Sequence, residues 1–329
     1  MIFIGKSPYR ISLLGGGSDL DWFVEREGHG TCLGYSLDKY SYSVLNVLPQ
    51  FAKYGILNYS VRETYQQTTE IAHPLIKSVL DKFPNLGFIE LSTFGFASGG
   101  SGLGGSSAFL LSLIAALNAS YNHIDSVESI AHIACEIEIK ELSKPIGRQD
   151  QYLSALGGIN ALSFKKNGGV IPLNIGIDKL NMLNRVINDF YLVPSFKTRP
   201  ADKVLMSLKD DPSSINSFKD IRNIAKSFIE LDEARDHILE ESFHQSMRES
   251  WEIKKEMTNV MNPSLNEQYN QLKKIPNNWI RLIGAGSGGY FLISPKTEQE
   301  VFESQAIDMG FNDFSKASLS NQGLTNSII

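Results

Sequence analysis

The chain has 329 residues, of which 42% are hydrophobic and 20% are charged, and this composition excludes a natively disordered protein. Its 31 Lys and Arg residues against 36 Asp and Glu residues give a net charge of −5. Binding to the phosphate backbone of a nucleic acid requires a cluster of basic residues. No stretch of this sequence has such a cluster, so we expect no nucleic-acid partner. The two cysteines, Cys32 and Cys135, are too few for a disulfide framework. The length favours two domains.

The sequence also predicts a soluble, cytoplasmic protein without a membrane partner. At the amino terminus Lys6, Pro8 and Arg10 follow Met1 closely, so the apolar core of a secretory signal is missing. The most apolar stretch, Phe109–Leu117, is about half as long as the ~20 residues that span a bilayer.

Short apolar runs rich in branched or aromatic residues, bounded by Gly, Pro or Asn, predict β-strands. In chain order these runs are Tyr42–Leu48, Phe88–Leu91, Ile159–Phe164, Phe190–Val193, Trp279–Ile283 and Tyr290–Ile293. Apolar residues at spacings of three and four predict helices over Ser106–Asn118 and Val127–Leu142, each with a serine near its start that suits an N-cap.

In the second half of the chain the pattern changes. Asp210–Ser217 has the composition of a turn-rich loop. Between Phe218 and Met257, apolar residues are interspersed with charges of both signs, which predicts one or two long amphipathic helices with a solvated face. We expect Asn262-Pro263 to end them.

Three successive glycines, Gly15 to Gly17, follow a largely apolar run and precede Ser18 and Asp19. Such glycines let another molecule approach the backbone closely, and Asp19 offers a bidentate acceptor for hydroxyl groups. A hairpin turn with a solvated aspartate fits the same residues, so the local sequence leaves both interpretations open.

A second glycine-rich segment, Gly99–Ser107, leads directly into a predicted helix. This arrangement directs several backbone N–H groups and the positive end of the helix toward one point, which suits a phosphate group; a flexible surface turn is the alternative. Two stretches match the dinucleotide pattern G-x-G-x-x-G, beginning at Gly100 and at Gly284, but neither has the structural context of that pattern. The Gly-Lys-Ser/Thr ending of a Walker loop is missing.

Two acidic residues occupy positions that suit chemistry. Glu138 falls on an otherwise apolar stripe of its predicted helix, so its carboxylate needs a partner: a magnesium ion brought by a nucleotide, or a salt bridge to Arg or Lys. Asp150 lies in a polar turn beside Gln149 and Gln151, where it can orient or deprotonate a hydroxyl group, or cap the helix that follows. The histidines lack zinc-site spacing, and no G-x-S-x-G elbow is present.

Three motifs in order resemble those of the galactokinase, homoserine kinase, mevalonate kinase and phosphomevalonate kinase (GHMP) superfamily: Pro8–Asp19, Gly102–Ala108 and Leu282–Gly289. Four further features are similar to the D-glycero-D-manno-heptose 7-phosphate kinase branch of that superfamily. They are the triple glycine with Ser-Asp, the Gly-x-Gln-Asp-Gln-Tyr turn that ends at Tyr152, Lys197–Ala201, and Glu249–Lys255 followed by Asn262-Pro263. The resemblance spans almost the full chain.

The resemblance implies an α+β fold of two domains, the two-domain GHMP kinase fold. An amino-terminal ATP-binding domain like the second domain of ribosomal protein S5 would cover residues 1–183, and a ferredoxin-like carboxy-terminal domain would cover residues 184–329. We place the junction in the polar stretch Asp178–Asp189. ATP and a sugar would bind between the two domains.

The resemblance also implies roles for individual residues. The loop residues Gly100, Ser101, Gly102, Leu103, Gly104, Gly105, Ser106 and Ser107 would bind the ATP phosphates. Ser106 and Glu138 would hold Mg²⁺, and Asp150 would face the acceptor hydroxyl, with Arg10 stabilising its charge and that of the transferred phosphoryl group. The residues expected to contact the substrate are Gly17, Ser18, Asp19, Arg199 and Gly286.

A phosphate group on the substrate would need a cationic partner. Candidates are Arg199, Lys254, Lys255 and Arg148. A solvated surface charge is the alternative for each of them, and it is the interpretation that we favour for the two lysines.

The function that the resemblance implies is that of an ATP- and Mg²⁺-dependent sugar 1-kinase, a phosphotransferase with an alcohol group as acceptor. It would phosphorylate the anomeric hydroxyl of D-glycero-D-manno-heptose 7-phosphate, in the synthesis of nucleotide-activated heptose for surface polysaccharide. Two alternatives stay open: a kinase of an unphosphorylated sugar such as fucose or galactose, and a binding protein with the same fold but no turnover.

Overall fold

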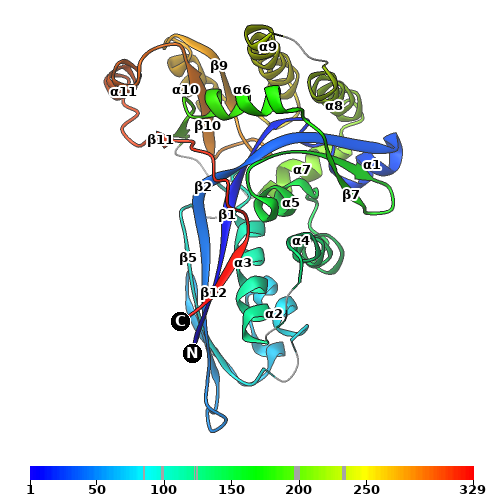
Figure 1. Cartoon of the computed structure of the whole chain (residues 1–329), viewed down its shortest axis with the longest axis vertical. Coiled ribbons are helices and arrows are strands. Elements are labelled where there is room, and N and C mark those ends of the chain that lie inside the picture. Colours follow the sequence, from blue (N-terminus) through cyan, green and yellow to red (C-terminus); the bar gives the residue numbers. More distant parts are fainter. Residues whose placement is uncertain (84–85, 98–99, 122, 124, 196–200, 232–234) are drawn as a thin grey trace.

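The computed structural model describes residues 1–83, 86–97, 100–121, 123, 125–195, 201–231 and 235–329. In this part of the chain, strands and helices build two sheets with helices packed on them (Figure 1). None of the helices described there combines the length and the apolar character needed to cross a bilayer.

The first sheet has eight strands: β1 (Ile2–Leu14), β2 (His29–Val47), β3 (Gly55–Asn58), β4 (Arg62–Tyr65), β5 (Ile89–Gly95), β6 (Ile159–Lys165), β7 (Val170–Leu173) and β12 (Thr325–Ile328). Six of them follow the order β12-β1-β2-β5-β3-β4, and β6 pairs with both β2 and β7. Strands β3 and β5 run parallel, whereas the other paired strands run antiparallel.

Helices pack on one face of this sheet (Figure 1): α2 (Pro74–Leu80), α3 (Gly105–Ser120), α4 (Val127–Cys135) and α5 (Gln149–Leu156). Helix α3 is buried on nearly all sides, as expected for a helix whose residues are apolar all round, and it contacts β1 and β2. A π-helical turn, Glu136–Glu141, continues α4. The short helix α1 (Asp21–Glu27) follows β1.

The burial of β1 changes along its length. Residues 2–6 alternate between half-buried and buried, as in a strand with one covered face, whereas residues 7–11 are all buried. Helices of both halves contact this strand: α3 and α5 of the first half, and α8 (Ser214–Glu230) and α9 (Asp236–Lys255) of the second half. Arg10 therefore lies on a strand enclosed between the two halves of the chain.

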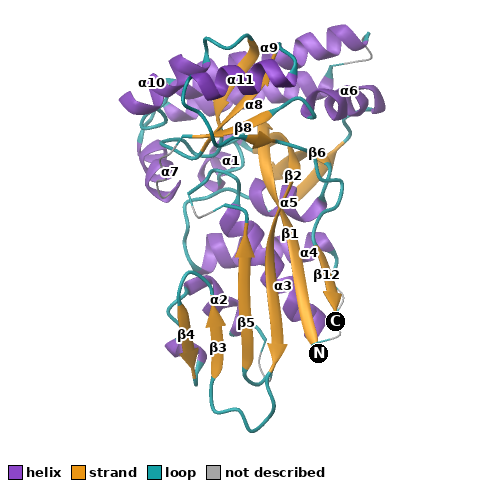
Figure 2. Cartoon of the chain, turned by 90° about the vertical axis from the view of Figure 1, so that its left-hand side faces the viewer, coloured by secondary structure: helices purple, strands orange, loops and turns teal. Residues whose placement is uncertain are grey.

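The second sheet has four antiparallel strands in the order β11-β8-β10-β9: β8 (Tyr191–Pro194), β9 (Asn277–Leu282), β10 (Tyr290–Pro295) and β11 (Ser315–Lys316). Helices gather around it (Figure 2): α6 (Ile177–Ile187), α7 (Ala201–Asp210), α8, α9, α10 (Pro263–Leu272) and α11 (Gln299–Asp308). One apolar cluster joins Tyr9 and Ile11 of β1 to Leu192 of β8 and Phe228 of α8, so the two halves share part of their core.

The predicted strands are confirmed. Five have ends shifted by up to four residues, whereas Tyr42–Leu48 covers only the last part of the much longer β2, and the predicted helix over Ser106–Asn118 lies within α3. The amphipathic stretch from Phe218 to Met257 forms two helices, α8 and α9. The polar stretch Asp178–Asp189 forms most of α6, and the division at residue 183 falls inside this helix. The division into two domains at this residue stays a prediction. The last strand of the chain, β12, belongs to the first sheet, where it pairs with β1.

Three expectations are corrected. Asn262-Pro263 begins α10 rather than ending a helix, because the Asn262 side chain accepts a hydrogen bond from the Leu265 N–H at 3.1 Å and proline fits the first helical turn. Of the expected loop Asp210–Ser217, only residues 211–213 separate α7 from α8. The predicted helix Val127–Leu142 changes from α-helical to π-helical at Glu136.

Candidate active site

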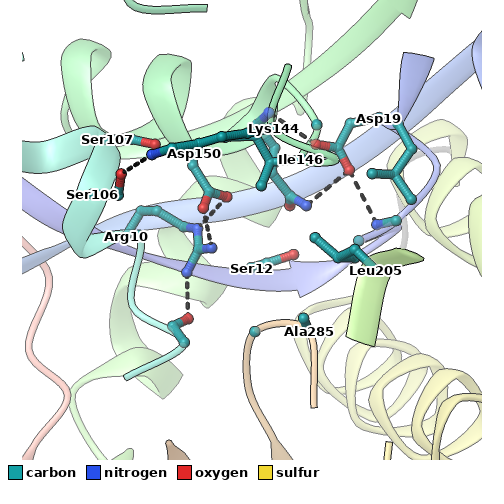
Figure 3. A pocket seen from close by; sticks show the side chains of 18 of the residues that line it. Arg10, Ser12, Asp19, Ser106, Ser107, Lys144, Ile146, Asp150, Leu205 and Ala285 are labelled. Atoms are coloured by element: carbon teal, nitrogen blue, oxygen red, sulfur yellow. Dashed lines mark hydrogen bonds and ion pairs between the residues drawn. The ribbon is translucent and has the colours of Figure 1, made fainter. Parts of the chain in front are cut away.

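A cavity of about 530 Å³ is lined by both halves of the chain (Figure 3). Its volume lies within the range of about 300–1,000 Å³ that is usual for small-molecule sites. Its walls are β1 and the turn after it, the loop before α3, residues 144, 146–147 and 149–150 at the start of α5, helices α7, α8 and α9, and the turn after β9.

The glycine-rich loop forms the wall of the cavity at the start of α3. Gly104 is the N-cap of this helix, with a left-handed backbone at φ 74°. Because the first N–H groups of a helix have no acceptor within it, those of this first turn are available to an anion in the cavity. The loop residues that line the cavity are Gly100, Ser101, Gly102, Gly104, Gly105, Ser106 and Ser107.

Leu103 does not line the cavity with the rest of the loop. Its side chain is buried in the apolar core that the two halves share. Its backbone carbonyl accepts a hydrogen bond from the Arg10 N–H at 3.0 Å. Leu103 therefore anchors the loop on β1. Gly99 lies outside the described residues.

Arg10 and Asp150 form a two-point ion pair in the cavity (Figure 3). The Arg10 Nε donates to Asp150 Oδ1 at 2.7 Å, and Nη2 donates to Oδ2 at 2.5 Å. Nη1 donates to the carbonyl of Gly102 at 2.5 Å, which ties the pair to the loop. Asp150 lies in the first turn of α5 without capping it, because the N-cap position is Arg148 and no side chain caps this helix.

Glu138 is fully buried in the π-helical turn after α4, and its carboxylate has four partners. Oε1 accepts hydrogen bonds from Ser106 Oγ at 2.5 Å and from Lys144 Nζ at 2.9 Å. Oε2 accepts from Ser107 Oγ and from Gln151 Nε2, each at 2.7 Å. Of the two partners predicted for Glu138, the structure therefore shows the salt bridge, with Lys144 as the cation.

The same oxygens also suit a magnesium ion. The Ser106 hydroxyl and one Glu138 oxygen lie 2.5 Å apart beside the cavity, and Mg²⁺ prefers such oxygen ligands. The Lys144 ammonium lies against both of them, donating to Ser106 Oγ at 2.8 Å (Figure 3) and to Glu138 at 2.9 Å. Sequence reasoning missed Lys144, and we find no signal in the sequence that would have identified it.

Asp19 is buried in the turn after β1 and is bound to the start of α5. Its Oδ1 accepts from Gln149 Nε2 at 2.9 Å and from the Gly17 N–H at 3.1 Å, and its Oδ2 accepts from the Gln149 N–H at 3.0 Å. Burial raises the pKa of Asp19 to about 6; the hydrogen bond from the Gln149 N–H lowers it and the charge of Asp150 raises it. Gly147 permits this contact, because a Cβ there would lie 1.9 Å from Asp19 Oδ2. The aspartate is thus not a solvated turn residue.

The triple-glycine turn lines the cavity through Gly16, Gly17 and Asp19, but Ser18 does not line it. The Ser18 side chain is fully buried. Its hydroxyl oxygen lies 2.8 and 2.9 Å from two backbone carbonyls, to one of which it donates, and it accepts from the Thr31 N–H at 3.0 Å, which fixes the turn. Gly286 is not among the lining residues either, although positions 284–285 of the same turn are. Arg199 lies outside the described residues, so its role stays a prediction.

Lys254 of α9 lines the cavity, so the favoured interpretation of a solvated surface charge is wrong for this residue. Its Nζ donates to the carbonyl of Gly284 at 2.5 Å. A signal was present in the sequence, because Lys254 lies seven residues after Met247 and three after Trp251, in line with the buried stripe of its helix. Apolar lining residues that sequence reasoning also missed are Leu205, Leu208 and Phe218.

The two other cations considered for a substrate phosphate do not line this cavity. Lys255 forms a salt bridge with Glu252 at 2.5 Å. Arg148 forms a salt bridge with Asp21 and donates to the carbonyl of Lys165 at 3.1 Å. Both side chains therefore have partners of their own outside the site.

Residues 72–158 match the family model described as the GHMP kinases N terminal domain. The matched range includes the glycine-rich loop together with Glu138 and Asp150. Arg10 and Asp19 precede it.

Two curated relatives match most of this chain. The D-glycero-alpha-D-manno-heptose 7-phosphate kinase of Campylobacter jejuni is 25% identical over 334 residues, which cover 94% of this chain and 95% of the relative. The bifunctional fucokinase/GDP-fucose pyrophosphorylase of Arabidopsis thaliana is 24% identical over 334 residues, which cover 90% of this chain and 30% of that longer protein.

Solved structures match the whole fold. A D-glycero-D-manno-heptose 1-phosphate kinase from Bacteroides thetaiotaomicron superposes with a TM-score of 0.77 at 20% identity, covering 99% of both chains. The galactokinase of Lactococcus lactis, solved with galactose, gives a TM-score of 0.74 at 14% identity and covers 98% of this chain and 95% of its own. A mevalonate kinase gives 0.72 at 16% identity, covering 97% and 99%.

These comparisons confirm the resemblance found in the sequence. The chain has a GHMP kinase N-terminal domain, and its α+β fold is the fold of these kinases. A domain of this family indicates an enzyme that transfers a phosphoryl group to an alcohol.

Proposed function

We propose that this chain, which has the N-terminal domain and the fold of GHMP kinases, is an ATP- and Mg²⁺-dependent sugar 1-kinase. Its acceptor is the anomeric hydroxyl of D-glycero-D-manno-heptose 7-phosphate, and its product enters the synthesis of nucleotide-activated heptose in the cytoplasm. The heptose 7-phosphate kinase from Campylobacter jejuni, which matches 94% of this chain, supports this choice of acceptor.

The observation that carries the proposal is that three groups open onto one cavity. They are the first-turn amides of α3, the oxygen pair of Ser106 and Glu138, and the ion pair of Arg10 and Asp150. Phosphoryl transfer needs little covalent work from a protein and depends on positioning and charge neutralisation. The cavity offers both, with a helix end for phosphate oxygens and a carboxylate for a hydroxyl group.

The ion pair supplies the group that handles the acceptor. A carboxylate oxygen of Asp150 would accept a hydrogen bond from the acceptor hydroxyl, which orients that hydroxyl and can take up its proton. Arg10 would hold Asp150 in place, because it contacts both carboxylate oxygens as well as the carbonyl of Gly102. Its positive charge would also stabilise the negative charge of the transferred phosphoryl group.

The metal site depends on how Glu138 is held. Ser107 and Gln151 fix its Oε2, so that Oε1 faces Ser106 and the cavity. Mg²⁺ bound to Ser106 and Glu138 would neutralise charge on the nucleotide phosphates. No lysine of a Walker loop is needed for this, since the loop itself contributes backbone amides.

Asp19 and Gln149 would form the polar end of the acceptor site. Both line the cavity, and Gln149 holds the Asp19 carboxylate through its backbone and side-chain N–H groups. Among the described residues, no partner binds the buried Gln149 Oε1. An oxygen left without a partner beside a cavity is suited to a hydroxyl donor of a sugar.

The proposal is tested by incubating the protein with Mg²⁺ and ATP against a panel of sugars and sugar phosphates, with products identified by phosphorus NMR. We expect a new anomeric phosphate on D-glycero-D-manno-heptose 7-phosphate. Equal turnover of the heptose without its 7-phosphate, or preference for fucose or galactose, would replace the proposed acceptor. Absence of any product, with ATP and sugar binding intact, would identify a binding protein.

A further inference from the structure

Lys254 stands apart from the other cations of the cavity. The cationic lining residues in the described part of the chain are Arg10, Lys144 and Lys254. Arg10 is paired with Asp150, and Lys144 is paired with Glu138. The Lys254 ammonium instead donates to a carbonyl, that of Gly284, and no carboxylate of a described residue lies within ion-pair distance of it. Lys254 is half-buried, and holding a cation there without a counter-ion is unfavourable, so its position suits an anion that comes from outside the protein.

The position of Lys254 is next to the glycine-rich loop. Gly284, whose carbonyl binds the ammonium, packs against Gly102, because a Cβ on Gly284 would lie 2.5 Å from the Gly102 Cα. Arg10 binds the carbonyl of Gly102 from the first half of the chain. Two cations from different halves thus hold two backbone segments that touch each other beside one cavity.

We propose that Lys254 is a phosphate-binding residue, whose ammonium binds a phosphate oxygen of a ligand in the cavity. Two phosphates have this chemistry: the one that the sugar acceptor carries and the terminal phosphate of the nucleotide. The inference rests on the proposed function, since both phosphates belong to substrates of that reaction. It assigns to the second half of the chain a charged contact that complements Arg10 and the loop amides of the first half.

The electrostatic surroundings of Lys254 agree with this role. Burial lowers the pKa of Lys254 to about 7, with further lowering by Arg281 and Arg10, while Asp19 and Asp150 raise it. The remaining charged residues that line the cavity are Glu138, Lys144 and Asp202. A phosphate dianion favours the ammonium form of the lysine. Its binding therefore draws a proton from solution near pH 7, and its affinity falls as the pH rises above about 7.

Calorimetric titration of Lys254→Met, which removes the charge and keeps an unbranched side chain, tests the proposal. Two pairs of probes each differ by one phosphate: the β,γ-imido analogue of ATP against ADP, and D-glycero-D-manno-heptose 7-phosphate against D-glycero-D-manno-heptose. We expect the affinity for the phosphorylated member of at least one pair to fall about tenfold or more, the loss expected for one charge-assisted contact. The affinity for the partner that lacks this one phosphate changes less than twofold.

Two further variants separate charge from structure. Lys255→Met removes the neighbouring charge, which is bound to Glu252 outside the cavity, and we expect it to bind all four probes like the wild type. Lys254→Arg keeps a cation and recovers at least part of the lost phosphate affinity. Titration of the wild type at pH 7 in two buffers with different ionisation enthalpies reports proton uptake directly, so that the test does not depend on the folding of Lys254→Met.

The pair of probes that loses affinity identifies which phosphate Lys254 binds. Equal losses for the two members within both pairs, unchanged affinity for all four probes, or no proton uptake by the wild type would each overturn the proposal. The outcome is separable from that of the proposed function. If the wild type binds the imido analogue through Lys254 but does not bind the heptose 7-phosphate, the phosphate site is supported and the proposed acceptor is wrong. If the wild type phosphorylates the heptose 7-phosphate and Lys254→Met binds every probe normally, the proposed acceptor is supported and the phosphate site is wrong.

Discussion

The guanidinium of Arg10 meets both carboxylate oxygens of Asp150, with Nε 2.7 Å from Oδ1 and Nη2 2.5 Å from Oδ2. Arg10 is 7% exposed at its side chain and Asp150 is 23% exposed, so the carboxylate is the member of the pair that the cavity reaches more easily. Because two parallel contacts fix a carboxylate in one plane, Asp150 is oriented before any acceptor arrives.

Replacing Asp150 by Asn removes the charge that would orient or deprotonate the acceptor hydroxyl, while the side chain keeps its shape. We expect turnover to fall by at least about a hundredfold, the low end of general acid–base effects, with nucleotide affinity nearly intact. Steady-state kinetics and nucleotide titration measure the two quantities. Turnover like that of the wild type would remove Asp150 from the mechanism.

Replacing Glu138 by Gln weakens the proposed metal site without removing its oxygen. We expect the Mg²⁺ concentration for half-maximal activity to rise by about tenfold or more, since losing even a supporting group of a metal site has effects of that size. A Mg²⁺ titration at saturating ATP measures it. The matched control is Glu141→Gln in the same π-helical turn, where the carboxylate is 38% exposed and bound to Lys82. Identical Mg²⁺ titrations for the wild type and Glu138→Gln would exclude metal binding by this residue.

Replacing Lys144 by Met leaves the buried Glu138 without its cation. Because Lys144 is 21% exposed and Glu138 is 0% exposed, we expect the free energy of unfolding to fall by about 3 kcal/mol, the lower end for breaking a buried pair. Mg²⁺ should then take the vacated position, so its addition without nucleotide raises the Tm of the variant more than that of the wild type.

Thermal unfolding with and without Mg²⁺ checks the Lys144 prediction. Lys140→Met is the control, because Lys140 lies in the preceding π-helical turn, is 59% exposed and contacts Asp21 rather than Glu138. Equal Mg²⁺-dependent shifts of Tm in the wild type and Lys144→Met would show that the ammonium does not compete with the metal.

Asp19 predicts a pH dependence of stability. Burial raises its pKa from 3.8 to about 6, so between these values the folded chain keeps the proton and the unfolded chain releases it. Its contribution to stability is therefore fully present below pH 4 and is lost as the pH rises through about 6, by up to about 3 kcal/mol. Chemical denaturation at several pH values should show this decline in the wild type and not in Asp19→Asn. Parallel curves for the two proteins would contradict the shift.

The sequence predicted those parts of the site whose signals are local. Glycines that precede an apolar helix, and a carboxylate in a polar turn, can be read within a few residues, and the structure brings both to one cavity. Lys144 and Lys254 could not be assigned in this way, because their roles depend on Ser106, Glu138 and Gly284, which lie elsewhere in the chain.

The fold shows the same division. Strands with continuous apolar runs were predicted, but β1 was not, because Pro8, Arg10 and Ser12 interrupt its apolar pattern. This strand is enclosed on both sides, and Arg10 is tolerated there because Asp150 and the carbonyl of Gly102 satisfy its donors. The functional residue Arg10 therefore interrupts the apolar pattern from which β1 would have been predicted.

The pairing of β12 with β1 has a mechanical consequence. Residues 2 and 329 exchange two backbone hydrogen bonds, at 2.8 and 2.9 Å, and the strands run antiparallel away from that point. A force that pulls these two residues apart acts along the hydrogen bonds and loads them one pair at a time, instead of shearing them together. Under such tension the last strand unzips first, and the sheet that carries Arg10 resists until this edge has peeled away.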